Sequence, residues 1–113
     1  MKLEVGMYVR TKKHGICKIE GFASTLTDDY IENEKDSLIL KDEIIKSSRN
    51  IIDLIEEGDF VNRDPVWLET NGKLFVGDVE QGYYLDEFKK WDIKIETIVT
   101  KEQFESMVYK VEE

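Results

Sequence analysis

Cysteine, histidine and proline are almost missing from this chain of 113 residues, which contains one of each. A single cysteine excludes an internal disulfide and is typical of a reducing compartment. One histidine and one cysteine are too few for a zinc site of the usual His/Cys kind. No apolar run approaches the ~20 residues that a membrane-spanning helix needs. The start, residues 1–5, lacks the apolar core of a signal peptide, so we expect a cytoplasmic protein without a membrane partner.

Positive charge is also scarce, with 16 Lys and Arg against 25 Asp and Glu, a net charge of −9. Residues 1–50 are neutral, with nine charges of each sign, and residues 51–113 hold seven basic and sixteen acidic residues. The whole excess therefore lies in the second half. The electrostatic field of this excess negative charge repels nucleic-acid phosphates and favours docking on a basic protein surface. The alternative is that the carboxylates only keep a small protein soluble.

Hydrophobic residues make up 41% of the chain and aromatic residues 11%, which is enough for a folded core. The length fits one domain, or two very small ones with a shared interface. An internal repeat favours two. Residues 3–9 and 55–61 both follow the pattern aliphatic-Glu-x-Gly-x-aromatic-Val, 52 positions apart. Glycine before the aromatic residue indicates a sharp turn into a strand, so we expect a duplicated unit.

Short strands and turns fill the first unit. Residues 8–11 and 16–20 should form strands joined by a turn at 12–15. The polar stretch 25–36 is expected to be a loop, 37–40 a strand, and 43–47 a strand or a helical turn. The segment 50–55 should link the units and be buried.

The second unit has clearer turn signals. Asn71-Gly72 is typical of a type I′ hairpin and should join residues 66–70 to 73–78. Further elements are predicted as turns at 62–65 and 81–82, strands at 93–95 and 97–99, a terminal strand or frayed end at 108–111, and a short helix capped by Thr100 and Gln103. We therefore expect a mainly β fold of two SH3-like barrels in tandem, residues 1–50 and 51–113, with a short helix near the C-terminus.

Candidate catalytic groups are few. His14 and Cys17 lie three residues apart, but one falls in a turn and the other in a strand, with no third group to orient them. Adjacent carboxylates on a strand point to opposite faces, so pairs such as Asp86-Glu87 are better explained as solvated surface than as an acid–base or metal site. The tip at residues 12–14 is a small basic patch. We expect no enzyme, no metal and no cofactor.

Aromatic residues concentrate in the second unit, which holds nine of twelve. Most should be core, but Tyr83 and Tyr84 are consecutive and cannot both face inward on a strand. One should be exposed and is a candidate interface anchor. Together with neighbouring carboxylates, they define an expected partner-binding surface: Asp78, Glu80, Tyr83, Tyr84, Asp86, Glu87 and Asp92.

Two resemblances add to this interpretation. Residues 5–10 and 14–21, Val-Gly-Met-Tyr-Val-Arg and His-Gly-Ile-Cys-Lys-Ile-Glu-Gly, resemble the opening of CarD-like, Tudor-type domains that bind RNA polymerase. That family's basic helical domain has no counterpart here. The resemblance implies a β-rich module that contacts host RNA polymerase, or another transcription component, through the hairpin at residues 8–20.

A broader resemblance covers residues 50–62 and 98–107 as well as the N-terminal motif. These stretches look like a family of small, largely uncharacterised proteins of phages and prophages of Gram-positive bacteria. The resemblance implies a non-enzymatic inhibitor of host defence, such as an anti-CRISPR protein, in the host cytoplasm. Its partner would be a host protein with a basic surface, such as a Cas nuclease, and it would act as a nucleic-acid mimic. The family supplies no site residues.

Overall fold

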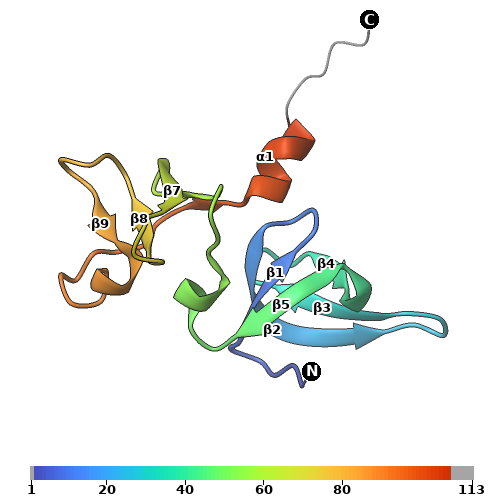
Figure 1. The fold of residues 1–113 in the computed structure, drawn as a ribbon. Helices are drawn as coiled ribbons and strands as arrows, with labels where there is room; N and C mark the ends of the chain where they lie inside the picture. Colours follow the sequence, from blue (N-terminus) through green and yellow to red (C-terminus); the bar gives the residue numbers. More distant parts are fainter. Residues whose placement is uncertain (1, 108–113) are drawn as a thin grey trace, which may run out of the picture. The chain divides into compact units, whose positions relative to one another are not determined.

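The computed structural model describes residues 2–107, and it divides into two compact units, Met1–Leu54 and Ile55–Glu113. The sequence placed this boundary after residue 50. The fold is mainly β, with a five-stranded antiparallel sheet in each unit and one short helix near the C-terminus. Figure 1 follows the strands of each unit along the chain.

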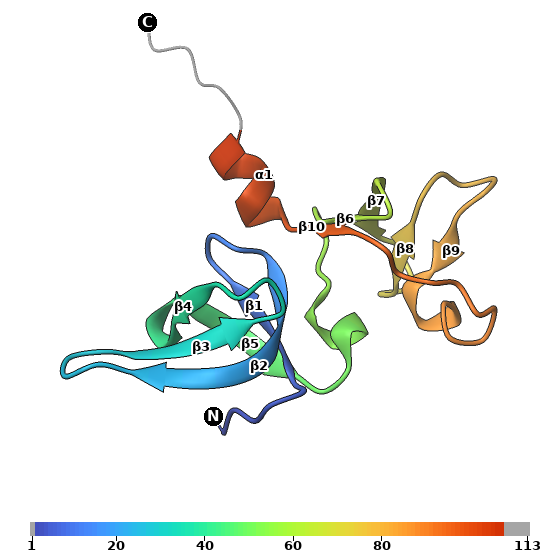
Figure 2. The ribbon, with the colours of Figure 1, turned by 180° about the vertical axis from the view of Figure 1, so that it is seen from behind.

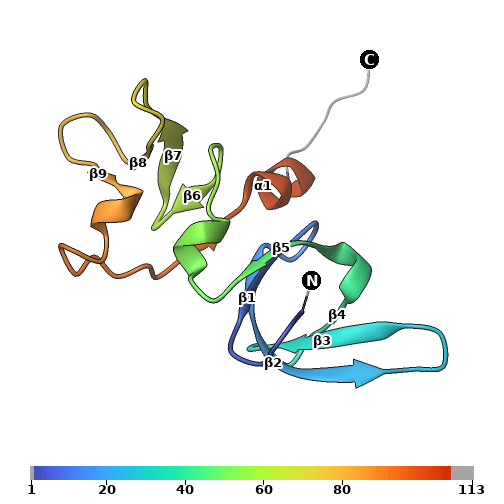
Figure 3. The same ribbon diagram turned by 60° about the horizontal axis from the view of Figure 1, so that its bottom comes forward.

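The first unit is one continuous antiparallel sheet in the order β4-β3-β2-β1-β5. A register shift between Ile19 and Gly21 bends β2, so that it pairs with β1 at its start and with β3 at its end. Figure 3 shows β1 running at a steep angle to the β2–β3 hairpin. The strands are β1 (Tyr8–Thr11), β2 (Ile16–Ser24), β3 (Asp29–Asn33), β4 (Leu38–Leu40) and β5 (Ile44–Ser48), with 3-10 turns η1 (Lys41–Glu43) and η2 (Ile51–Leu54).

The core of this unit collects the inward positions of four strands: Val9, Cys17, Ile19, Ile31 and Ile39. Leu3, Met7 and Ile44 pack against this cluster from its edges. The strand alternation that places these residues inward is the period of two of an antiparallel sheet with one buried face.

Arg10 is also fully buried, and one of its guanidinium nitrogens donates a hydrogen bond to the Leu54 carbonyl at 2.8 Å. This hydrogen bond ties β1 to the end of η2, so Arg10 contributes nothing to a basic surface.

The prediction of a loop over residues 25–36 was wrong. β3 lies inside it and pairs with β2 through Phe22↔Ile31 and Ala23↔Tyr30. Its carboxylates obscured the strand, because Asp29 and Glu32 face solvent while Ile31 and Asn33 point inward. The strands predicted at 8–11, 16–20 and 37–40 are confirmed, although β2 extends to Ser24. Residues 43–47 form both of the alternatives in succession, since η1 leads into β5.

The linking segment 50–55 is only partly buried. Leu54 and Ile55 are buried, whereas Asp53 is exposed and accepts a hydrogen bond from the Ser48 hydroxyl at 2.8 Å.

The second unit repeats the order of the first. Its sheet runs β10-β6-β7-β8-β9, which matches β5-β1-β2-β3-β4 strand for strand, and each unit places a 3-10 turn between its fourth and fifth strands. Figure 2 shows β10 alongside β6. The elements are β6 (Phe60–Val61), β7 (Asp64–Leu68), β8 (Leu74–Val76), β9 (Tyr83–Tyr84), η3 (Leu85–Glu87), β10 (Ile98–Val99) and α1 (Lys101–Met107).

The repeated motif folds alike in both units. Gly6 and Gly58 both have positive φ, +92° and +95°, at the third position of a turn closed by Met7 N to Glu4 O and by Asp59 N to Glu56 O, each 3.1 Å. Both glycine amides also donate to a strand carbonyl: Gly6 N to Ile19 O of β2 at 2.9 Å, and Gly58 N to Val66 O of β7 at 3.0 Å. Shared hydrogen bonds at matched positions support an internal duplication.

Closed barrels are not confirmed. The outer strands of each sheet, β4 and β5 in the first and β9 and β10 in the second, are not neighbours in the sheet order. What the structure shows is two open antiparallel sheets.

Two turns of the second unit differ from the prediction. The hairpin at Asn71-Gly72 exists, but only Gly72 has positive φ, so its turn is not type I′. The two successive positive φ values of a I′ turn occur at Asn62 and Arg63 instead, between β6 and β7. The turn predicted at 62–65 is therefore two residues shorter, because Asp64 and Pro65 already belong to β7.

The C-terminal elements follow the prediction in part. The strand predicted at 97–99 is present as β10, but residues 93–95 form no strand. The capping box of α1 is confirmed: Gln103 N donates to Thr100 Oγ1 at 3.2 Å, and Thr100 N donates to Gln103 Oε1 at 3.1 Å. The strand predicted at 108–111 lies outside the described residues.

Candidate functional site

The predicted partner-binding residues lie on one stretch of the second unit. It runs from the β8–β9 loop through β9 and η3 to the turn at residues 89–92. We call residues 78–92 the acidic segment. The predicted partner-binding residues in it fall into three local groups, centred on the loop, on β9 and on η3.

The loop group depends on Asp78. Asp78 Oδ1 accepts hydrogen bonds from the backbone amides of Glu80 at 3.0 Å and Gln81 at 2.7 Å, and its carbonyl accepts from Gly82 N at 2.8 Å. This carboxylate therefore holds the loop, whereas Glu80 is exposed. Val79, which the sequence analysis left out of the site, is 77% exposed beside it.

The β9 group separates the two tyrosines, as predicted. Tyr83 is 45% exposed, while Tyr84 is partly buried and meets the Phe75 ring edge-on at a centroid distance of 5.1 Å. The Tyr84 hydroxyl accepts a hydrogen bond from Asn71 Nδ2 at 3.1 Å. Tyr84 is thus structural, and Tyr83 is the more exposed of the two tyrosines.

Lys73 connects this group to η3. Its ammonium lies 5.8 Å from the Tyr84 ring centroid and 3.4 Å from Asp86 Oδ2. Both partners of that ion pair are 59% exposed, so water screens it and leaves the Asp86 carboxylate accessible.

The η3 group holds a residue that the sequence analysis counted as an aromatic but did not place in the site. Trp91 is 58% exposed, and its indole N–H donates to Glu87 Oε2 at 3.1 Å. The spacing of four residues between Glu87 and Trp91 could have indicated this pair, because such positions meet on a helical turn. Asp92 follows, exposed and at a φ of +54°.

The structure therefore joins Asp78 to Glu80, Asp86 to Tyr84 through Lys73, and Glu87 to Trp91. Exposed apolar side chains at 79, 83 and 91 alternate along the chain with carboxylates. Aromatic side chains are enriched at protein interfaces, so the exposed Tyr83 and Trp91 are candidate anchors.

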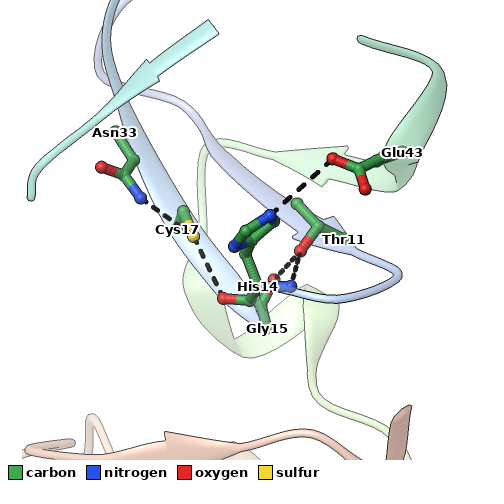
Figure 4. A network of polar contacts seen from close by, with 6 residues as sticks. All are labelled: Thr11, His14, Gly15, Cys17, Asn33 and Glu43. Carbon is green, nitrogen blue, oxygen red and sulfur yellow. Dashed lines mark hydrogen bonds and ion pairs between the residues drawn. The ribbon is translucent and has the colours of Figure 1, made fainter. Parts of the chain in front are cut away.

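The other candidate pair does not form a nucleophile and base. Figure 4 shows the Cys17 thiol directed at the His14 backbone carbonyl, 3.3 Å away, while the His14 ring lies 3.8 Å from Glu43 Oε2. Asn33 Nδ2 approaches the same sulfur at 3.8 Å. Burial raises the pKa of Cys17 above its usual 9.0, so the thiol stays protonated near neutral pH.

This environment predicts an unreactive cysteine. At pH 8, a thiol reagent such as 5,5′-dithiobis(2-nitrobenzoate) should label native Cys17 at least about a hundredfold more slowly than Cys17 in urea, because labelling requires both deprotonation and opening of the core. The absorbance of the released thiolate measures both rates. Equal rates would contradict the burial of the thiol.

Because the fold raises the pKa of Cys17, the contribution of its protonated thiol to the free energy of unfolding is present below pH 9 and is lost as the pH rises further.

Two features are absent from residues 2–107. No three His, Cys, Asp or Glu side chains lie close enough together to hold a metal ion. Within the same range, the structure contains no helix with the length and hydropathy to cross a membrane. No protein-family model matches the chain, and neither the curated proteins nor the solved structures include a significant match to it.

Proposed function

We propose that this protein is a non-enzymatic interaction module whose acidic segment binds a basic surface of a host protein. The observation that carries the proposal is the acidic segment itself, where five carboxylate side chains, Asp78, Glu80, Asp86, Glu87 and Asp92, are interspersed with the exposed Val79, Tyr83 and Trp91. In its specific form, the protein comes from a phage or mobile element and is an anti-CRISPR or other anti-defence inhibitor. It occupies a groove that a host nuclease uses for nucleic acid.

Charge and apolar burial contribute to the proposed binding in different ways. Carboxylates facing Lys and Arg side chains speed the encounter and make it sensitive to salt. Tyr83 and Trp91 then supply apolar area, since aromatic anchors contribute much of the energy of an interface.

The proposed fold for each unit is an SH3-like barrel. Its support is the shared strand order with a 3-10 turn before the last strand.

The test measures binding of the full chain to a panel of purified Cas nucleases at about 50 mM and about 500 mM salt. We expect affinity to fall at high salt. Tyr83→Ala should weaken binding about tenfold or more, because it removes an exposed aromatic ring. The double variant Glu80→Gln with Asp92→Asn should weaken binding about fivefold, because it removes two carboxylates. Neither carboxylate accepts a hydrogen bond from the loop, so the fold should be unaffected.

A matched control removes two charges elsewhere in the same unit. Glu57→Gln with Glu105→Gln, both exposed, should leave affinity within twofold. Affinity that does not respond to salt, or that falls equally with the control pair, would remove the acidic segment as the contact.

A second candidate is a module that binds host RNA polymerase through the first unit. The observation in its favour is the hairpin of β1 and β2, which pairs Tyr8↔Lys18 and presents Lys12, Lys13 and His14, all exposed, at its tip. Binding of polymerase that is lost in Lys12→Ala with Lys13→Ala, and kept in Tyr83→Ala, would favour this candidate over the first.

A further inference from the structure

The outer face of strands β2, β3 and β4 is unusually apolar. Register places six residues on it in two rows, since cross-strand partners share a face: Gly21, Glu32 and Leu38 form one row, and Ala23, Tyr30 and Leu40 the other. The opposite face carries Ile31 and Ile39, which belong to the core.

An antiparallel sheet with one solvated face normally carries polar side chains there. Here Glu32 is the only charged residue of the six. Leu38 is 52% exposed, and Tyr30, Leu40 and Ala23 are only partly buried. None of these four residues packs against the core cluster, whose partly buried neighbours are Leu3, Met7 and Ile44. The face therefore has apolar area that the unit does not use to hold itself together.

Charge along the β2–β3 hairpin has one sign, whereas Lys35 and Lys41 flank β4. Residues 19–34, which form most of the β2–β3 hairpin, contain no Lys or Arg. They contain five carboxylates, at Glu20, Asp28, Asp29, Glu32 and Glu34. Glu32 extends along the face, because a Cβ built on Gly21 would lie 3.0 Å from Glu32 Oε2. A ligand for this face should be apolar, with basic side chains that can meet Glu32 on the central strand and the carboxylates of the hairpin.

We propose that this face docks a basic amphipathic helix of a partner protein. Three strands at ~4.8 Å spacing give a surface about 10 Å wide, which matches the diameter of one α-helix. The small residue Ala23 on β2 leaves room for the helix beside Tyr30 and Leu40, while the Glu32 carboxylate lies over Gly21 and can face a basic side chain of the helix. Helix-on-sheet packing buries such a face in many folds. This surface is separate from the acidic segment and goes beyond the function proposed above.

The probe is a synthetic helix-forming peptide of about 14 residues with leucine at i, i+3, i+4 and i+7 and lysine elsewhere. It is titrated into the 15N-labelled full chain and followed by amide chemical shifts. We expect shifts in β2, β3 and β4. A peptide with glutamate in place of lysine should bind at least about tenfold more weakly, because the hairpin carboxylates repel it.

Two variants and one control locate the contact. Leu38→Ser should weaken binding about tenfold, because it removes the most exposed apolar side chain of the face, and Leu38→Lys should weaken it further by repelling the peptide. The control is Leu68→Ser, since Leu68 is also a strand leucine that is 52% exposed, and it lies in the second unit. It should bind as the unmodified chain does.

Three results would overturn the proposal: no binding, equal binding of the glutamate peptide, or affinity unchanged in both Leu38 variants. Shifts confined to residues 78–92 would also overturn it, while supporting the acidic segment as the basic-ligand site. The failure of one surface is thus distinguishable from the failure of the other.

Discussion

Gly82→Ala is expected to destabilise the second unit by about 3 kcal/mol. A Cβ at this position would lie 2.3 Å from Phe75 Cε1, 2.3 Å from the Val76 carbonyl oxygen and 2.7 Å from the Asp78 carbonyl oxygen. Two of these three atoms belong to the backbone, so no rotation of a side chain relieves the clash. A unit of this size has little stability to lose.

Tryptophan fluorescence during urea titration measures this effect, because both tryptophans, Trp67 and Trp91, lie in the second unit. The comparison variant is Gly72→Ala, whose Cβ meets nothing within 4 Å but whose φ of +82° strains an L residue. It should cost about 1 kcal/mol. If both variants unfold at the same urea concentration, close packing at Gly82 is not what the position requires.

Asp59→Ala should destabilise the same unit by about 3 kcal/mol. Asp59 is fully buried, and its two carboxylate oxygens accept hydrogen bonds from Glu56 N at 2.7 Å and from Lys101 N at 2.9 Å. Alanine would leave two amides without these acceptors, and each buried unsatisfied donor costs about 1–3 kcal/mol. Because Lys101 begins α1, the variant should also detach the helix from the turn.

Urea denaturation gives the loss in stability, and amide hydrogen exchange of residues 101–104 reports the detachment of the helix. Glu57→Ala is the control, since Glu57 lies in the same turn but is exposed. It should change stability by less than about 0.5 kcal/mol. Similar losses in the two variants would show that the turn, and not the Asp59 carboxylate, supports the helix.

The elements that the sequence predicted well are those set by local chemistry. The capping box at Thr100 and Gln103 and the turns at Gly6 and Gly58 depend on residues within four positions of one another. The repeat was visible for the same reason. Strand β3 was missed because its identity depends on pairing with β2, and the carboxylates of residues 25–36 are typical of a loop when no partner strand is known.

The turn at Asn62 and Arg63 shows a second limit. Arginine at positive φ is disfavoured locally, and the structure holds this turn through distant contacts of Asn62. Its side chain accepts hydrogen bonds from the amides of Glu96 and Thr97 and donates to the Lys94 carbonyl. These partners lie more than 30 positions away in the sequence, so no local pattern indicates them. Judged by local residues alone, Asn71-Gly72 was the stronger candidate for a I′ turn, although Asn62-Arg63 adopts the two positive φ values.

The candidate site was predictable in composition but not in detail. Charge asymmetry and consecutive tyrosines located the acidic segment. The sequence could not show that Asp78 is committed to its own loop, that Tyr84 packs on Phe75, or that Trp91 is exposed, because each depends on the course of the chain after Val76. The outer face of β2, β3 and β4 was invisible for the same reason: it requires the strand that was taken for a loop.

The pairing of each unit's first strand with its last also bears on the origin of the chain. In the first unit Tyr8 faces Ser48 across the ladder, and Glu4 forms an ion pair with Arg49, so entry and exit of the polypeptide lie together. Val61 and Ile98 meet in the same way in the second. A segment whose ends coincide can be copied beside itself, or joined end to end and reopened at another loop, without stretching any connection. Circularly permuted forms of either half, opened at the β3–β4 or β7–β8 turn, are therefore expected to keep its strand pairing.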